Sequence, residues 1–307
     1  MRFSVNVPNF GDLADARAVA TVARAAEDAG WDGLFVWDHV VHRKEARRGQ
    51  PFGDPWMLLT AAALATSTIR LGTLVTPVAR RRPEQLARQV ATLDAVSGGR
   101  AVFGAGLGGP VEDEFGSFGD ETDPVVLAEK LDEGLGLLAR YWAGERVDHD
   151  GPHYRVRDVE ILPATVQQPR PPVWVGGFWP ARRPFRRAAR WDGVVPLFAS
   201  GHGVPPTPGE VREVTEYVAE HRTAGGLSAV GMVGAVGSND AVGSVDTAAP
   251  FEVVVGGLTT PEAAADVVGP LAEAGATWWD ERGLYESPDL YSLPAVLRRV
   301  EAGPPRL

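Results

Sequence analysis

Short apolar runs alternate along the chain with amphipathic runs of about ten to seventeen residues. This alternation predicts strand–helix units around a parallel sheet, in which buried strands are apolar and each covering helix has one polar face. The expected strands are 3–7, 34–37, 69–75, 101–105, 173–175, 193–197, 251–255 and 277–279. The expected helices are 13–29, 55–66, 83–98, 124–142, 181–190, 208–221, 261–274 and 293–301.

Eight such units favour one α/β architecture, the closed (β/α)8 or TIM barrel. An open, doubly wound sheet is the alternative, but it usually contains fewer units. The turn after the first strand, Pro8-Asn9-Phe10-Gly11, also lacks the glycine-rich motif that binds dinucleotides. We therefore expect residues 1–307 to form a single barrel domain.

Two segments lie outside the repeating pattern. Residues 145–172 contain Asp150-Gly151 between two alternating stretches, which predicts a hairpin-like excursion before the fifth strand. Residues 224–250 are rich in Gly, Ala, Val and Ser and have no clear period. Loops of this length are unusual in compact domains, so we interpret the segment as a flexible insertion before the seventh strand. A small hairpin or an oligomer contact is the alternative.

Composition excludes several classes of protein. The chain has no cysteine, which rules out disulfides and thiolate metal sites. A net charge of -10 argues against a general nucleic-acid partner. Neither a membrane-length apolar run nor a signal-peptide pattern is evident, so we expect a cytoplasmic protein. The Ala-rich faces of the second and third helices could form a homodimer contact.

In a barrel of this kind the active site lies where the strands end at their carboxyl termini, a region called the mouth below. The second strand ends in Trp37-Asp38-His39, so Asp38 and His39 are candidate catalytic residues. A loop histidine bonded to backbone is the alternative. His39 and His42 could suggest a metal pair, but no carboxylate or cysteine cluster supports one, and we expect no metal.

Glycines mark the ends of further strands. Gly106 follows the fourth strand, and Gly176-Gly177 follow the fifth, just before an expected helix. Glycines let a flat ring or a phosphate approach the backbone, and amides at a helix N-terminus attract anions. Tight turn geometry is the alternative reading of each glycine.

Charged and aromatic residues also gather in the mouth loops. The expected basic set is Arg43, Lys44, Arg47, Arg48, Arg80, Arg81, Arg82, Arg182 and Arg183. These cations could attract an anionic cofactor or substrate, although an acidic loop around Glu114 opposes them and solvated arginines are equally compatible. Trp278 and Trp279 must face opposite sides of the last strand. Trp279 and Arg282 are candidate substrate contacts, but Arg282 could instead pair with Asp280 or Glu281.

Taken together, these stretches resemble the luciferase-like flavin-dependent monooxygenases and their deazaflavin-dependent relatives. The segments that carry the resemblance are 29–39, 71–77, 88–100, 114–115, 131–133, 171–177 and 187–193. The chain departs from the family at Leu127-Ala128-Glu129-Lys130, where many members have an Arg-Gly-Arg type stretch, and in the 224–250 segment. The resemblance therefore does not carry the substrate over.

The resemblance implies a cofactor ring across the mouth with His39 beside its reactive position. It also implies a non-proline cis peptide after the third strand and a cofactor phosphate held by the glycine pair. The implied cofactor-binding residues are Thr73, Leu74, Val75, Gly106, Gly176, Gly177 and Phe178.

Several functions are compatible with these residues. The Asp38-His39 pair resembles the deazaflavin branch, so we favour hydride transfer between coenzyme F-420 and a small organic substrate. The first alternative is an FMN-dependent monooxygenase supplied by a partner flavin reductase. The others are a non-catalytic flavin-binding protein and an unrelated barrel hydrolase.

Overall fold

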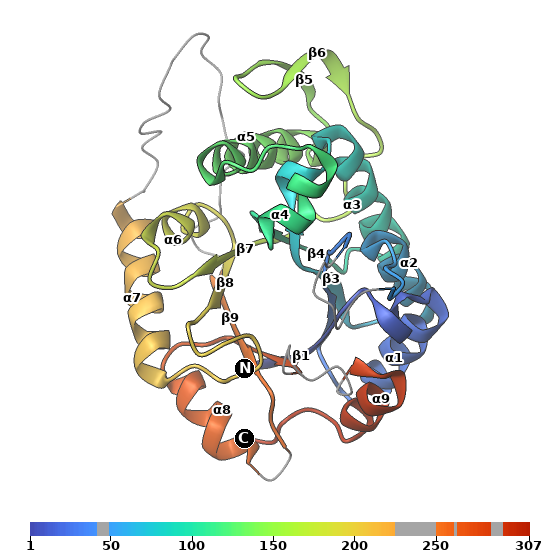
Figure 1. Cartoon of the computed structure of the whole chain (residues 1–307), viewed down its shortest axis with the longest axis vertical. Coiled ribbons are helices and arrows are strands. Elements are labelled where there is room, and N and C mark those ends of the chain that lie inside the picture. The colour runs from blue at the N-terminus through green and yellow to red at the C-terminus, as the bar shows by residue number, and fades with distance from the viewer. Residues whose placement is uncertain (42–48, 225–249, 261–262, 284–290) are drawn as a thin grey trace.

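The computed structural model describes residues 1–41, 49–224, 250–260, 263–283 and 291–307. Eight parallel strands close into a barrel in the order β1-β10-β9-β8-β7-β4-β3-β2, and Figure 1 looks into it with the helices around the outside. The predicted α/β barrel is therefore confirmed. Its strands are β1 Arg2–Val7, β2 Gly33–Val36, β3 Arg70–Pro77, β4 Ala101–Gly106, β7 Val173–Phe178, β8 Gly193–Leu197, β9 Glu252–Gly257 and β10 Trp278–Arg282.

The helices begin and end near the predicted capping residues. Asp54 accepts hydrogen bonds from the amides of Trp56 and Met57 at the start of α2, and left-handed Gly98 ends α3. Among the described residues, no helix combines the length and apolar character needed to cross a membrane. The α-helices are α1 Ala16–Asp28, α2 Pro55–Ala65, α3 Pro83–Ser97, α4 Val111–Glu114, α5 Pro124–Trp142, α6 Arg182–Ala188, α7 Pro208–Ala224, α8 Ala264–Glu273 and α9 Leu293–Glu301. The 3-10 helices are η1 Gly11–Ala14, η3 Val78–Arg80 and η4 Gly116–Phe118.

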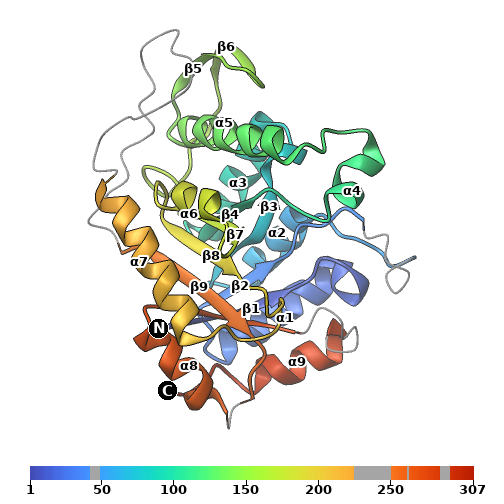
Figure 2. The same cartoon turned by 60° about the vertical axis from the view of Figure 1, so that its left-hand side comes forward.

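The predicted hairpin is present before β7. Strands β5 (Arg146–Asp150) and β6 (Arg155–Glu160) pair antiparallel and project beyond α5, as Figures 1 and 2 show. The predicted insertion at 224–250 lies almost wholly outside the described residues.

Two strands, β7 and β10, extend three residues beyond their predicted carboxyl ends. β7 continues to Phe178 because Gly176 and Gly177 pair with Val195 and Pro196 of β8. β10 continues to Arg282, which pairs in register with Asn6 of β1. Glycines and charged residues look like a loop in the sequence, but pairing with neighbouring strands holds them in the barrel wall.

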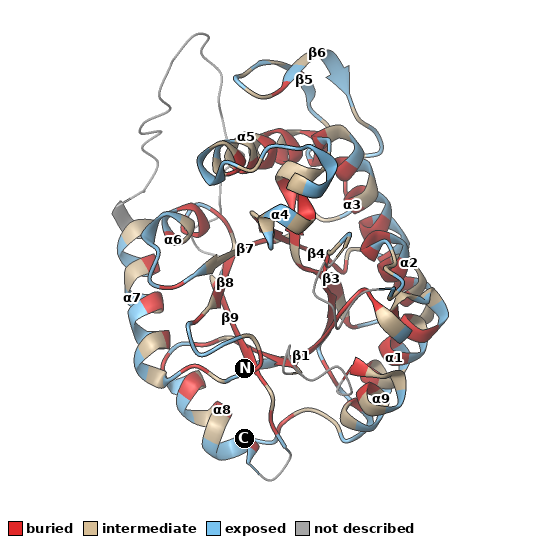
Figure 3. Ribbon diagram, in the orientation of Figure 1, coloured by how far each residue is buried: buried red, intermediate tan, exposed pale blue. Residues whose placement is uncertain are grey.

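The core has two layers. The outer layer fills the space between strands and helices, and Figure 3 shows that the strands and the inward helix faces are buried. The inner layer fills the lower barrel interior with aromatic rings, since Trp174 lies 5.3 Å from both Phe35 and Trp278 between ring centres. Its members are Phe35, Leu74, Val102, Trp174, Val195, Val254 and Trp278. This apolar plug forms the floor of the mouth.

A buried arginine, Arg100, stabilises the end of the barrel opposite the mouth. Arg100 follows Gly98 and Gly99, both with positive φ, and is 8% exposed. Its guanidinium donates to acceptors at the ends of α2 and α3 and before β3, at 2.7–3.1 Å: Ser97 O, Thr66 Oγ1, Ile69 O, Ala63 O and Thr66 O. This bonding gives a physical reason for the 88–100 motif, because only a planar fork with five donors reaches all of these acceptors.

Replacing Arg100 with lysine should therefore destabilise the barrel. The single ammonium of Arg100→Lys cannot span the separated carbonyls, and we expect a loss of about 3 kcal/mol in the free energy of unfolding. Urea unfolding measures the change, with Arg24→Lys on the exposed face of α1 as the control. Equal free energies of unfolding for the two variants would show that the Arg100 hydrogen bonds do not stabilise the barrel.

Candidate functional site

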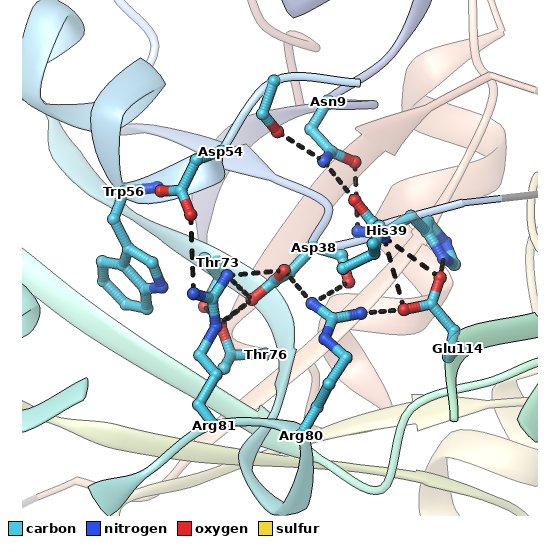
Figure 4. A network of polar contacts seen from close by, with 12 residues as sticks. Asn9, Asp38, His39, Asp54, Trp56, Thr73, Thr76, Arg80, Arg81 and Glu114 are labelled. Atoms are coloured by element: carbon cyan, nitrogen blue, oxygen red, sulfur yellow. Dashed lines mark hydrogen bonds and ion pairs between the residues drawn. The ribbon is translucent and has the colours of Figure 1, made fainter. Parts of the chain in front are cut away.

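Asp38 is the centre of a buried polar network just beyond β2. Its carboxylate is 4% exposed and accepts from Thr76 Oγ1 at 2.8 Å, from Arg81 Nη2 at 3.0 Å and from Arg80 Nη2. Thr76 lies in β3, and both arginines follow that strand. Figure 4 shows the two guanidinium groups converging on this one carboxylate.

Glu114 connects the same network to His39. It ends the short helix α4 after β4, is fully buried, and places Oε1 2.9 Å from His39 Nδ1. The other carboxylate oxygen pairs with Arg80 Nη1, so Arg80 bridges Asp38 and Glu114 (Figure 4). Asn9 fixes the His39 backbone, since its Nδ2 donates to His39 O at 2.7 Å and its Oδ1 accepts from His39 N at 3.1 Å.

The network neutralises two arginines that the sequence assigned to a basic mouth. Burial lowers the pKa of the Arg80 guanidinium, and the neighbouring Asp38 opposes that shift. For Arg81, burial also acts to lower the pKa, but Asp38 outweighs it and the pKa is raised. The two arginines are balanced by Asp38 and Glu114, which corrects the expectation that they attract a ligand. Arg43, Lys44, Arg47 and Arg48 lie outside the described residues, as does His42.

Glycines shape the mouth next to this network. A Cβ built on Gly106 of β4 would lie 2.5 Å from Val75 Cγ2, and one on Gly176 of β7 would lie 3.0 Å from Val75 Cγ1. The Leu74–Val75 peptide is cis, as the resemblance implies. A side chain at either glycine would collide with Val75, so glycine is the residue that fits beside Val75 at these two positions. Backbone without a side chain lets a ring cofactor approach closely.

The predicted phosphate site lies near the end of β7. Gly176 and Gly177 belong to this strand, and α6 begins at Arg182, one residue after its predicted start. A cofactor phosphate held by the amides of the glycine pair stays a prediction. Gly177 faces outward, where a Cβ would meet Pro184 Cβ at 2.3 Å, and its role is close packing of α6. Phe178 ends the strand with a side chain 65% exposed.

The remaining predicted site residues are all buried, and they lie in different parts of the barrel. Trp279 is fully buried in the outer layer and donates to Glu281 Oε2 at 2.8 Å, which corrects the expectation that it lines the substrate site. Thr73 is also fully buried and donates to Gly104 O at 3.2 Å. Arg282 pairs with Asp280 at 3.0 Å, one of the two partners left open by the sequence.

Sequence reasoning missed Asn6, Glu114 and His202. Asn6 and Asp280 line the barrel interior, where Asn6 Nδ2 donates to Asp280 Oδ2 at 2.7 Å. His202 lies in the loop after β8 with its ring 4.7 Å from Trp37. Glu114 stood in a recognised motif, but nothing in the sequence indicated its contact with His39. In the part of the chain that is described, no group of His, Asp or Glu is arranged for a metal.

Comparison with known proteins agrees with this geometry. Residues 1–225 match the family model described as luciferase-like monooxygenase. The chain belongs to the luciferase-like monooxygenase family. The match spans the strands that carry His39, Val75, Gly106 and Gly176.

Individual relatives include a dehydrogenase, a reductase and a monooxygenase. The F-420-dependent glucose-6-phosphate dehydrogenase of Beutenbergia cavernae is 36% identical over 137 residues, which span 44% of this chain and 40% of that protein. The coenzyme F-420 dependent tetrahydromethanopterin reductase of Methanopyrus kandleri has the same fold, with a TM-score of 0.70, 16% identity and coverage of 98% and 96%. A monooxygenase from Streptomyces bottropensis superposes with a TM-score of 0.69, 22% identity and coverage of 98% and 97%.

The half-buried His202 should make stability depend on pH. Burial, then the charges of Arg282 and His39, lower its pKa from 6.5 to about 3. Below pH 6.5 the unfolded chain takes up a proton that the folded protein refuses, so stability is lost as the pH falls. At pH 5 this linkage amounts to about 2 kcal/mol.

His202→Phe should therefore retain about 2 kcal/mol more of its pH 7 stability at pH 5 than the wild type does. Urea unfolding at the two pH values measures this, with His221→Phe on α7 as the control. An identical pH dependence in wild type and His202→Phe would refute the assignment.

Proposed function

We propose that the protein is an oxidoreductase that uses coenzyme F-420 to move a hydride to or from a small organic substrate. Two observations carry the proposal: Glu114 holds the His39 imidazole just beyond the end of β2, and Gly106 and Gly176 meet Val75 at the carboxyl ends of neighbouring strands of the same barrel. An acid–base group next to a surface that accepts a planar ring is the arrangement that hydride transfer requires.

Each of these residues has a part in the proposed reaction. Coenzyme F-420, when bound, supplies the ring atom that accepts or gives the hydride. In the oxidation direction the hydride leaves a substrate carbon while His39 takes the proton of the attached oxygen. Glu114 Oε1 lies 2.9 Å from Nδ1, and when it accepts from Nδ1–H, Nε2 is the atom that exchanges this proton. Asp38 acts indirectly, by holding Arg80 against Glu114.

Surface groups around β7 suit the remainder of the cofactor. Phe178 offers an exposed aromatic face, and the exposed residues Arg182 and Arg183 open the next helix. Arg182 lies 4.1 Å above the Trp179 ring, which holds its guanidinium near the end of β7. In the part of the chain that the structure describes, Arg182 and Arg183 would attract an anionic cofactor tail, whereas Arg80 and Arg81 would not.

An FMN-dependent monooxygenase is the second candidate. Its support is structural, because an FMN-bound Baeyer–Villiger monooxygenase of Pseudomonas putida shares this fold, with a TM-score of 0.59, 18% identity and coverage of 74% of this chain and 64% of that one. Such an enzyme would need reduced FMN from a partner flavin reductase. The sequence relative favours the deazaflavin, since that dehydrogenase depends on coenzyme F-420. A non-catalytic flavin-binding protein would differ from both in that His39→Ala would change no reaction.

Three further sequence predictions remain proposals. They are a single domain over residues 1–307 with an insertion at 224–250, a cytoplasmic location, and a homodimer formed through α2 and α3. The exposed side chains of Met57 and Leu64 on α2, at 57% and 75%, support a contact there.

Cofactor titration tests the proposed function. We expect coenzyme F-420 to bind the wild type more tightly than FMN, and Gly176→Val to weaken binding at least about tenfold because its side chain occupies the ring surface. Cofactor fluorescence measures both affinities. Gly136→Val on α5, where a Cβ meets nothing within 4 Å, is the control, and the melting temperature checks folding.

The outcomes separate the candidates. Preferential F-420 binding that Gly176→Val weakens supports the hydride-transferring enzyme. Preferential FMN binding replaces it with the monooxygenase. Binding of neither cofactor contradicts both, as does an unchanged affinity in Gly176→Val.

A further inference from the structure

A second polar cluster lies inside the barrel, where β1 and β10 meet. Asn6 and Arg282 are register partners on these strands, and both converge on Asp280 Oδ2, at 2.7 Å and 3.0 Å. Ser4 Oγ donates to the other oxygen of Asp280 at 2.7 Å. All four side chains are buried, with exposures of 3% or less.

The guanidinium of Arg282 already has a carboxylate partner in Asp280. The pKa of Asp280 is raised by burial, and Arg282, Asn6 and Ser4 offset only part of that shift. A further anion would have to compete with Asp280 for the same guanidinium, so the cluster does not favour an anionic ligand.

Two atoms of the cluster nevertheless lack partners. Arg282 Nε and Asn6 Oδ1 are buried and make no hydrogen bond within the described parts of the chain. A buried polar group left in this state costs about 1–3 kcal/mol, so a ligand or water is expected to satisfy it. One atom donates and the other accepts. A hydroxyl group satisfies both at once, whereas a carbonyl or carboxylate oxygen can only accept.

The cluster shares the mouth with the proposed acid–base residue. The loop residue His202 feels the charges of both Arg282 and His39, and its ring packs edge-on against Trp37. Gly256 of β9 makes room for Arg282, since a Cβ there would lie 2.4 Å from Arg282 Nε. Asn6 and Arg282 lie at the carboxyl ends of β1 and β10, and His39 follows the carboxyl end of β2, so a group bound to the cluster would lie on the same side of the barrel floor as His39.

We propose that Asn6 and Arg282 bind a hydroxyl group of an uncharged alcohol substrate, a hydroxyl other than the one whose proton His39 takes. Arg282 Nε donates to the hydroxyl oxygen, and the hydroxyl hydrogen is donated to Asn6 Oδ1. The group replaces a water molecule that can make the same two bonds. The link to turnover rests on the proposed function, but the binding site itself does not.

Ligand-observed NMR titration tests the site with three probes that share a six-membered carbon ring and differ in their polar group. Cyclohexanol should bind the wild type about tenfold more tightly than cyclohexanone, and cyclohexanecarboxylate should bind most weakly. In Asn6→Leu, which has no acceptor, the preference for the alcohol over the ketone should fall to about one. Ser4→Ala is the matched control, because it removes one hydrogen bond to Asp280 and leaves both unpartnered atoms in place.

The proposal is overturned if the carboxylate binds most tightly, if no probe binds, or if Asn6→Leu keeps the alcohol preference. The wild-type ranking needs no variant, so the test survives if Asn6→Leu does not fold. The titration is run without cofactor and again with bound coenzyme F-420. A negative cofactor titration would therefore refute the proposed function and leave the result on the hydroxyl site standing.

Discussion

The bridge that Arg80 makes between Asp38 and Glu114 is the interaction on which the mouth of the barrel depends. It joins three segments that are separate in the sequence: the end of β2, the turn after β3 and the short helix after β4. Separating the segments would break a buried ion pair and leave an uncompensated charge. Because that is costly, the ion pairs hold the three segments together. The orientation of His39 follows, because its imidazole rests on the same Glu114 carboxylate.

Above a common apolar floor, the two sides of the barrel interior carry different kinds of residue. Phe35, Trp174 and Trp278 close the lower lumen with an apolar plug. On the β3, β4 and β7 side, Gly106 and Gly176 meet Val75 without side chains of their own. On the β1 and β10 side, Asn6 and Arg282 present hydrogen-bonding groups. In our proposals the first side binds the cofactor and the second side binds the substrate, with the imidazole of His39 at the same mouth.

Periodicity was enough to predict the barrel, its hairpin and most helix limits, because alternation between buried strands and amphipathic helices is local. Contacts between distant segments were not predictable. Arg80 and Arg81 are basic residues in a loop by sequence, and only the fold reveals that Asp38 and Glu114 neutralise them. Likewise, two adjacent tryptophans must face opposite sides, but strand register decides that Trp278 faces inward and Trp279 outward.

The most direct test of this account is a crystal structure of the protein with bound coenzyme F-420. We expect the ring to lie on the surface of Val75, Gly106 and Gly176, with His39 Nε2 within about 4 Å of it and Arg80 still bridging Asp38 and Glu114. A ring bound away from His39 would contradict the account. So would an Arg80 side chain that leaves Glu114 to bind the anionic tail of the cofactor.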